Sequence, residues 1–177
     1  MKSFFQKYLI PLAILVFTIL VALDQWTKVL AVQFLKNQDP YVIWDGVFEF
    51  HYFENTGAAW GMLQNQQLFF YILTVIFCVV VLYEIYRLKA NPRYTTFIYT
   101  LAVMLAGAIG NFIDRISLQY VVDFIYVKII NFPIFNLADC YITVSVAVMM
   151  LFILFYYSDE EFEFIFPVFS GKRKKDK

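Results

Sequence analysis

The stretch AGAIGNFIDRI, residues 106–116, decides the fold of this chain because it places an amide, an acid and a base at the end of a long apolar segment. A carboxylate inside a bilayer is costly on every scale, so acids in such segments are rare and usually functional. Asp114 occupies that position here. Three more aspartates are flanked by apolar sequence: Asp24, Asp123 and Asp139. This concentration of acids is the strongest indication of function.

The composition is that of an integral membrane protein. Of 177 residues, 62% are hydrophobic and 16% are charged, whereas soluble domains have about 25% charged residues. A soluble protein of this size could not hide so much apolar surface. The net charge is zero, and the only basic run, KRKKDK at 172–177, is short and isolated. Nucleic-acid binding is therefore not expected.

Metal and disulfide chemistry are not expected either. The chain has one histidine, His51, and two cysteines, Cys78 and Cys140, which both fall in apolar segments. These residues do not form a usual zinc site or a disulfide pair. The sequence also has no phosphate-binding loop and no Ser/His or Cys/His arrangement. Carboxylates remain as the reactive groups, and we predict no metal and no cofactor.

Four apolar stretches are long enough to cross a bilayer at about 1.5 Å of rise per residue. Lysine and arginine gather before the first stretch, between the second and third, and after the fourth. By the positive-inside rule, both termini are expected in the cytoplasm. We predict an all-α integral membrane fold with one domain at 1–157 and a cytoplasmic tail at 158–177. Its spans are expected at about 8–30, 67–86, 95–116 and 137–157.

Two segments are expected on the outer side of the membrane. In the first, Asp45-Gly46 is a turn signal and residues 47–53 are rich in strand formers. We therefore predict a small β-element at about 41–61 that rests on the outer membrane surface. The second segment, about 117–136, contains Asp123 and is too short in apolar residues to span. We expect extended or interfacial backbone there.

Helical rise, counted from the cytoplasmic end of each predicted span, places the polar residues of different spans at a similar distance from the outer membrane surface. Asp24 lies about 24 Å of helical rise from the cytoplasmic end of its span. Asp114 lies at a similar depth in the third span, and Asp139 lies near the outer start of the fourth. The costly groups are therefore expected to meet near the outer surface. Helical spacing also predicts shared faces for Asp24 with Lys28, for Asn136 with Asp139, and for Gly107 with Asn111 and Asp114.

Two carboxylates that share a site cannot both ionise readily, so one keeps a proton. The ionised acid can take a proton from water while the protonated one polarises a carbonyl, which hydrolyses a peptide bond by general acid–base catalysis. The residues alone leave two alternatives open. Intramembrane acids also form relays in small proton or ion transporters. Alternatively, the protein could be a structural subunit whose acids only form ion pairs with Lys28 and Arg115. In either case we expect the Arg115 side chain to contact a carboxylate or lipid headgroups.

Five motifs resemble those of one known family. They are DQWTK at 24–28, NTGAAWG at 55–61, GAIGNFIDR at 107–115, VVDF at 121–124 and FNLAD at 135–139. Together they are similar to the lipoprotein signal peptidases, the type II signal peptidases of bacteria, over about residues 8–157. The resemblance implies four transmembrane helices with a small extracytoplasmic β-cradle and a short interfacial helix.

The resemblance also implies an activity. Members of that family are aspartyl endopeptidases of the bacterial cytoplasmic (inner) membrane, with the active site toward the outer face. They remove the signal peptide from a prolipoprotein just before its diacylglyceryl-modified cysteine. The implied partners are such prolipoproteins and membrane lipid, and we expect a monomer.

The resemblance further implies roles for individual residues. Asp123 and Asp139 correspond to the catalytic pair. Cys140 stands where the family commonly has serine, which is a small departure because either residue fits a helix. Supporting or substrate-positioning roles are implied for Asp24, Lys28, Asn55, Gly57, Asn111, Asp114, Arg115 and Asn136.

Overall fold

The computed structural model describes residues 4–57 and 62–167, so residues 58–61 of the NTGAAWG motif and 168–177 of the tail lie outside the described residues. Five α-helices, three strands and the short 3-10 helices η2 and η3 form the described chain. In order they are α1 (Phe4–Leu35), β1 (Tyr41–Trp44), β2 (Phe48–Asn55), α2 (Gln67–Leu88), η2 (Pro92–Tyr94), α3 (Thr95–Leu118), β3 (Val121–Val127), η3 (Lys128–Ile130), α4 (Leu137–Phe155) and α5 (Asp159–Ile165).

Helices α1, α2, α3 and α4 are long and apolar enough to cross a membrane, which confirms the four predicted spans. Helix α3 is central. In its most apolar stretch of 18 residues 56% of the residues are buried, whereas the corresponding shares in α1, α2 and α4 are 17%, 6% and 11%. The outer three helices leave large hydrophobic side chains exposed. An apolar surface of that extent suits lipid contact.

Helix α1 is longer than the predicted 8–30. Its 32 residues rise about 48 Å, more than the roughly 30 Å of the hydrocarbon core. The extension occurs because Ala31 and Leu35 pack against Val122 and Phe124 of β3, so apolar periodicity continues beyond the span. The helix is followed by Asn37, which adopts a left-handed φ of 60°.

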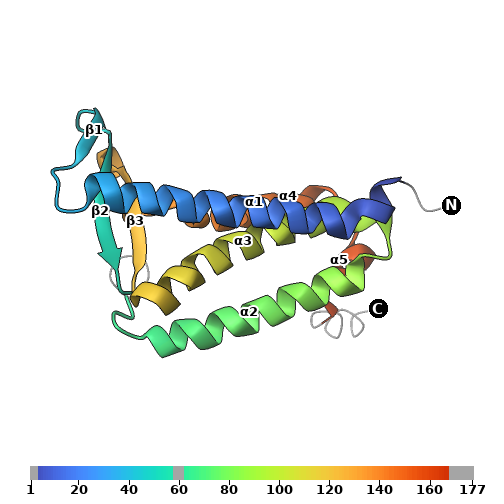
Figure 1. Ribbon diagram of the computed structural model, residues 1–177. Helices are drawn as coiled ribbons and strands as arrows, with labels where there is room; N and C mark the ends of the chain where they lie inside the picture. The colour runs from blue at the N-terminus through green and yellow to red at the C-terminus, as the bar shows by residue number, and fades with distance from the viewer. Residues whose placement is uncertain (1–3, 58–61, 168–177) are drawn as a thin grey trace.

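A three-stranded antiparallel sheet, in the order β1-β2-β3, lies at one end of the helices (Figure 1). It confirms the β-element predicted for the first outer segment, and β3 is the extended backbone predicted for the second. In the register of β2 and β3, Phe53 pairs with Asp123 and Asn55 pairs with Val121. The sheet thereby brings Asn55 beside Asp123.

Helix α5 packs at the other end of the molecule, where α1 begins (Figure 1). Ile165 of α5 is 1% exposed, and it joins a core cluster with Tyr94 and Tyr157. Arg93 pairs with Glu161 at 2.8 Å. The start of the predicted tail is therefore a helix that is packed against the membrane domain.

Candidate active site

A buried ion cluster joins α1 to α3. The ammonium of Lys28 lies 2.9 Å from Oδ2 of Asp24 and 3.0 Å from Oδ2 of Asp114. Its Nζ also donates to Oδ1 of Asn111 at 2.9 Å. All four side chains are buried. The Asp24–Lys28 pair predicted from helical spacing is confirmed, and the third helix supplies a second acid for the same lysine.

The acids of this cluster also hold neighbouring elements through backbone N–H groups. The N–H of Ala138, in the first turn of α4, donates to Oδ1 of Asp24 at 3.0 Å. The N–H of Val122, in β3, donates to Oδ2 of Asp114 at 3.1 Å. The side-chain amide of Gln25 donates to both carboxylates, at 3.2 and 3.0 Å. The cluster therefore attaches β3 and α4 to α1 and α3.

Asp123 projects from β3 and is 1% exposed. Its Oδ2 accepts from Nδ2 of Asn55 at 2.9 Å, and its Oδ1 accepts from Nδ2 of Asn136 at 2.7 Å. Burial and the nearby carboxylate of Asp139 raise the pKa of Asp123 to about 7. The two amide donors favour the charged form and oppose that rise. Asp123 is therefore a carboxyl group that exchanges its proton near neutral pH.

Asp139 occupies the first turn of α4, where it forms a capping box with Asn136. The N–H of Asn136 donates to Oδ2 of Asp139 at 3.1 Å, and the N–H of Asp139 donates back to Oδ1 of Asn136 at 3.1 Å. The other carboxylate oxygen accepts from Nδ2 of Asn111 at 2.7 Å. Helix capping and the amide of Asn111 thus fix this side chain.

Asn136 connects the two aspartates. Its Nδ2 donates to Oδ1 of Asp123 while its backbone N–H donates to Asp139. The segment before it is tied to β3, because the carbonyl of Phe135 accepts from the N–H groups of Phe124 and Ile125, at 3.0 and 2.8 Å. The start of α4 is thereby positioned beside β3, and each aspartate contacts the same asparagine.

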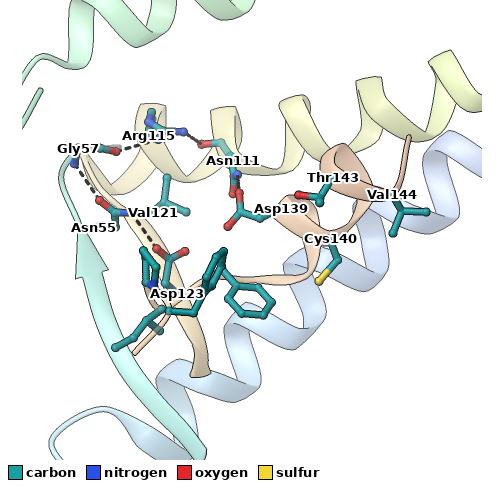
Figure 2. A pocket seen from close by; sticks show the side chains of 14 residues that line it. Asn55, Gly57, Asn111, Arg115, Val121, Asp123, Asp139, Cys140, Thr143 and Val144 are labelled. Atoms are coloured by element: carbon teal, nitrogen blue, oxygen red, sulfur yellow. Dashed lines mark hydrogen bonds between the residues drawn. The ribbon is translucent and has the colours of Figure 1, made fainter. Parts of the chain in front are cut away.

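Both carboxylates face one cavity of about 550 Å³ (Figure 2). One wall is apolar and is formed by the segment 132–135. Another is formed by α4, with Cys140, Thr143 and Val144. The polar lining consists of Asn55, Gly57, Asn111, Arg115, Asp123 and Asp139. The cavity therefore joins two acids to an apolar surface.

Arg115 lines this cavity and forms no salt bridge within the part of the chain that the structure describes. Its guanidinium donates to the carbonyls of Asn111 at 3.4 Å and Gly57 at 3.3 Å, and it lies 4.5 Å from the ring centre of Phe70. Its Nε is buried and has no hydrogen-bond partner among the described residues. The partners expected from sequence were a carboxylate or lipid headgroups. Among the described residues its hydrogen bonds go to backbone carbonyls, while Asp139, Asp123 and Asp114 act on it through their charges.

The residues named from sequence form two layers. Six of them line the cavity, Asn136 lies buried between the aspartates, and Asp24, Lys28 and Asp114 form the ion cluster behind them. Sequence reasoning missed Gln25, although its spacing of three residues from Lys28 places both on one helical face. It also missed the apolar wall at 132–135, because its role depends on pairing with β3.

Solved structures with a similar fold are bacterial membrane enzymes. One is 29% identical and superposes with a TM-score of 0.72, covering 95% of this chain and 96% of that chain. Another is 33% identical with a TM-score of 0.71, covering 84% of this chain and 96% of that one. The fold therefore places the chain in the class of multi-helix membrane enzymes.

The family follows from sequence comparison. A family model described as signal peptidase (SPase) II matches residues 16–155. A lipoprotein signal peptidase of Caldanaerobacter subterraneus subsp. tengcongensis is 44% identical over 145 residues, which cover 81% of this chain and 97% of the relative. A lipoprotein signal peptidase of Enterococcus faecalis is 40% identical over 140 residues, 79% of this chain and 86% of the relative. The chain belongs to the signal peptidase II family and is a membrane-embedded peptidase.

Proposed function

We propose that this chain is an aspartic endopeptidase that removes signal peptides from prolipoproteins, cleaving just before the diacylglyceryl-modified cysteine. The observation that carries this proposal is the pair Asp123 and Asp139, which share Asn136 and face one cavity with an apolar wall. Relatives of the chain are named lipoprotein signal peptidases, which supports the substrate class. Membership in a peptidase family favours hydrolysis over the transporter alternative.

The pair performs hydrolysis when it holds one proton. The ionised carboxylate takes a proton from water as the water oxygen attacks the peptide carbonyl carbon. The protonated carboxyl gives its proton to the carbonyl oxygen, so a neutral tetrahedral gem-diol forms. The C–N bond then breaks as the acid that took the proton from water passes it to the leaving amine of the modified cysteine. The other acid takes a hydroxyl proton back from the gem-diol, which becomes the new carboxyl group. The enzyme returns to its starting protonation state.

The lining of the cavity suits a lipidated peptide. The diacylglyceryl chains lie against exposed apolar residues of α4, such as Val144, while the peptide passes the two acids. Arg115 and Asn55 offer donors to peptide carbonyls beside the Asp123–Asp139 pair, here called the dyad. Binding of the lipid fixes which bond meets the aspartates, so positioning comes from contacts remote from the reaction. One chain supplies both acids, which supports a monomer.

The proposed location is the bacterial cytoplasmic membrane, with both termini inside and the sheet outside. Basic residues support this orientation, because Arg87, Lys89 and Arg93 lie in and beside the α2–α3 connection at the end of the molecule that is far from the sheet. The dyad would then lie close to the outer surface, where an exported prolipoprotein is presented.

Substitution of the two acids tests the proposal. Asp123→Asn and Asp139→Asn are each expected to reduce cleavage of a diacylglyceryl-modified peptide by at least about 10³-fold, because each removes one half of the acid–base pair. Asparagine has nearly the same shape as aspartate and keeps one of its two acceptor oxygens, so both variants should be recovered folded from membranes. Asp39→Asn, at an exposed position, is the matched control and should keep full activity. Near-normal cleavage by either dyad variant would exclude the aspartic mechanism.

A further inference from the structure

Lys28 belongs to a hydrogen-bonded chain that ends on the dyad. Its Nζ donates to Oδ1 of Asn111 at 2.9 Å, and Nδ2 of Asn111 donates to Oδ1 of Asp139 at 2.7 Å. The Lys28 side chain is 4% exposed. A buried ammonium is thus separated from a catalytic carboxylate by one amide group.

The chemistry of lysine fixes which groups donate and which accept along this series of hydrogen bonds. An ammonium has three donors and no acceptor, so the amide of Asn111 must turn its oxygen toward Lys28. Its NH₂ group is then left for Asp139. A cation on the amide oxygen polarises the group and strengthens its N–H as a donor, since linked hydrogen bonds reinforce one another in a low-dielectric site.

We infer that Lys28 is a positioning residue of the catalytic pair, which acts through Asn111 to hold the negative charge of the pair on Asp139 and leave the proton on Asp123. This inference rests on the proposed aspartic mechanism and assigns the two acids different roles. Asp139 takes the proton from water, and Asp123 donates to the peptide carbonyl.

The surroundings of the two acids differ in the direction that this assignment needs. Asp139 accepts from an amide linked to a cation and from the backbone of Asn136, and it lies in the first turn of α4, where the helix dipole favours negative charge. Asp123 accepts only from neutral side-chain amides among the described residues and is almost fully buried. Burial favours its protonated form.

Other charged groups around this chain must be kept constant in a test. Asp24 and Asp114 face Lys28 at 2.9 and 3.0 Å. Simple removal of Lys28 leaves two buried acids without a cation, which destabilises the fold and confuses the interpretation. Among the described residues, the titratable or charged groups that interact with the dyad or with these acids include Arg115, near Asp139, Asp123 and Asp114, Cys140 near Asp139, and Tyr141 near Asp24. Lys28 also acts on Asp123 directly by its charge, an effect weaker than burial and the Asp139 charge.

A charge-balanced double variant separates positioning from stability. Asp24→Asn with Lys28→Met removes one acid and one base, so the net charge of the cluster is unchanged. We expect the acidic limb of the pH profile of kcat/KM, where the pair takes up a second proton, to move up by about one pH unit. KM should change little because no substrate contact is removed, and the profile should become narrower.

Lys36→Met is the matched control. It also removes a lysine that pairs with an acid, Glu54 at 2.8 Å, but Lys36 makes no contact with Asn111. It should leave the pH profile in place. If the double variant shows a wild-type profile, with only a lower yield of folded protein, Lys28 is purely structural and the inference is wrong.

A second variant tests the same inference if the double variant does not fold. Asn111→Ser leaves Lys28 with both of its acids but removes the amide that reaches Asp139. It should produce the same upward shift of the acidic limb, and an unshifted profile would overturn the inference. Failure here is distinct from failure of the proposed function, which would appear as activity retained in Asp123→Asn or Asp139→Asn.

Discussion

A single asparagine side chain has two tasks at this site. Asn136 begins α4 by capping it, and its amide also donates to Asp123. A capping residue has a fixed geometry, because its oxygen must accept from the N3 backbone N–H. The NH₂ group of Asn136 is therefore aimed by the helix itself. The helix start and the geometry of the dyad depend on the same residue.

Replacing Asn136 tests this double role. Asn136→Ala removes a helix cap and a hydrogen bond to a carboxyl group, so stability is expected to fall by about 1–2 kcal/mol. Activity should fall by about 10²-fold, since the buried carboxyl group of Asp123 loses one of its two hydrogen-bond donors. The measurements are thermal unfolding in detergent and kcat/KM on a lipidated peptide.

Ser158→Ala provides the matched control for this variant. Ser158 forms the same kind of capping box, with Glu161, at the start of α5. It is expected to lose stability with unchanged activity at low temperature. Equal activity loss in both variants would show that capping alone, not contact with Asp123, explains the effect.

The raised pKa of Asp123 predicts a pH dependence. In the proposed mechanism the pair holds one proton to act, and the pKa of Asp123 is raised to about 7. The proton is lost as pH rises through that value, so kcat/KM is expected to fall about tenfold per pH unit above it. Asn55→Leu removes a donor that favours the charged form, so its basic limb should move to higher pH. A wild-type profile that stays flat through neutral and alkaline pH would contradict the assignment.

Among the elements, α3 is the one whose role is most visible in the sequence. Gly107, Asn111 and Asp114 were expected on one face, and all three are buried in the structure. The glycines permit close packing. A Cβ on Gly110 would overlap Oδ2 of Asp24 and lie 3.3 Å from Cβ of Ala138. The sequence predicts this buried helical face because the spacing of residues that share one side of a helix depends only on nearby positions in the chain.

The apolar wall of the cavity shows where local patterns are insufficient. Residues 132–135 reach the site because the backbone of Phe135 pairs with Ile125 of β3. That pairing depends on the position of β3, which itself pairs with β2 in a register that shifts between Phe50 and Phe53. Register across strands is set by the packed structure. The extended segment could therefore be predicted, but its place beside the dyad could not.

Helix α5 is expected to stabilise the domain without taking part in the chemistry. It lies at the end opposite the sheet, where Ile165 is buried and Arg87 donates to the carbonyl of Ile165 at 2.6 Å. Deletion of residues 158–177 should lower the unfolding temperature in detergent by about 5 °C. At low temperature kcat/KM should stay near the full-length value.

Deletion of residues 168–177 alone is the control for that truncation, because it retains α5 in full. It should leave the unfolding temperature close to that of the full-length chain. A loss of activity at low temperature in the longer deletion, with the domain still folded, would assign α5 a role in substrate handling instead.

On the scale of the whole molecule, polar groups from every layer meet at one end. Depth along the helices predicted this meeting for Asp24, Asp114 and Asp139, because helical rise is constant. Which acids face the cavity could not be predicted from depth. The structure separates them by neighbours, since Lys28 and Gln25 engage Asp24 and Asp114, whereas asparagine amides engage the other two. Which aspartates face the cavity therefore depends on the side chains that surround each of them in the folded protein, and the sequence position alone does not determine it.

The orientation of the whole molecule leads to a prediction about access from each side of the membrane. Asp39 is exposed near the sheet, and Lys89 is exposed at the far end, in the α2–α3 connection. If basic residues are held in the cytoplasm, the two positions lie on opposite sides. In a background where Cys78 and Cys140 are replaced by alanine, Asp39→Cys should react with a membrane-impermeant maleimide on intact spheroplasts. Lys89→Cys should react only after permeabilisation. The reverse pattern would place the dyad near the cytoplasmic surface, where an exported prolipoprotein could not be processed, so the labelling result bears directly on the proposed substrate.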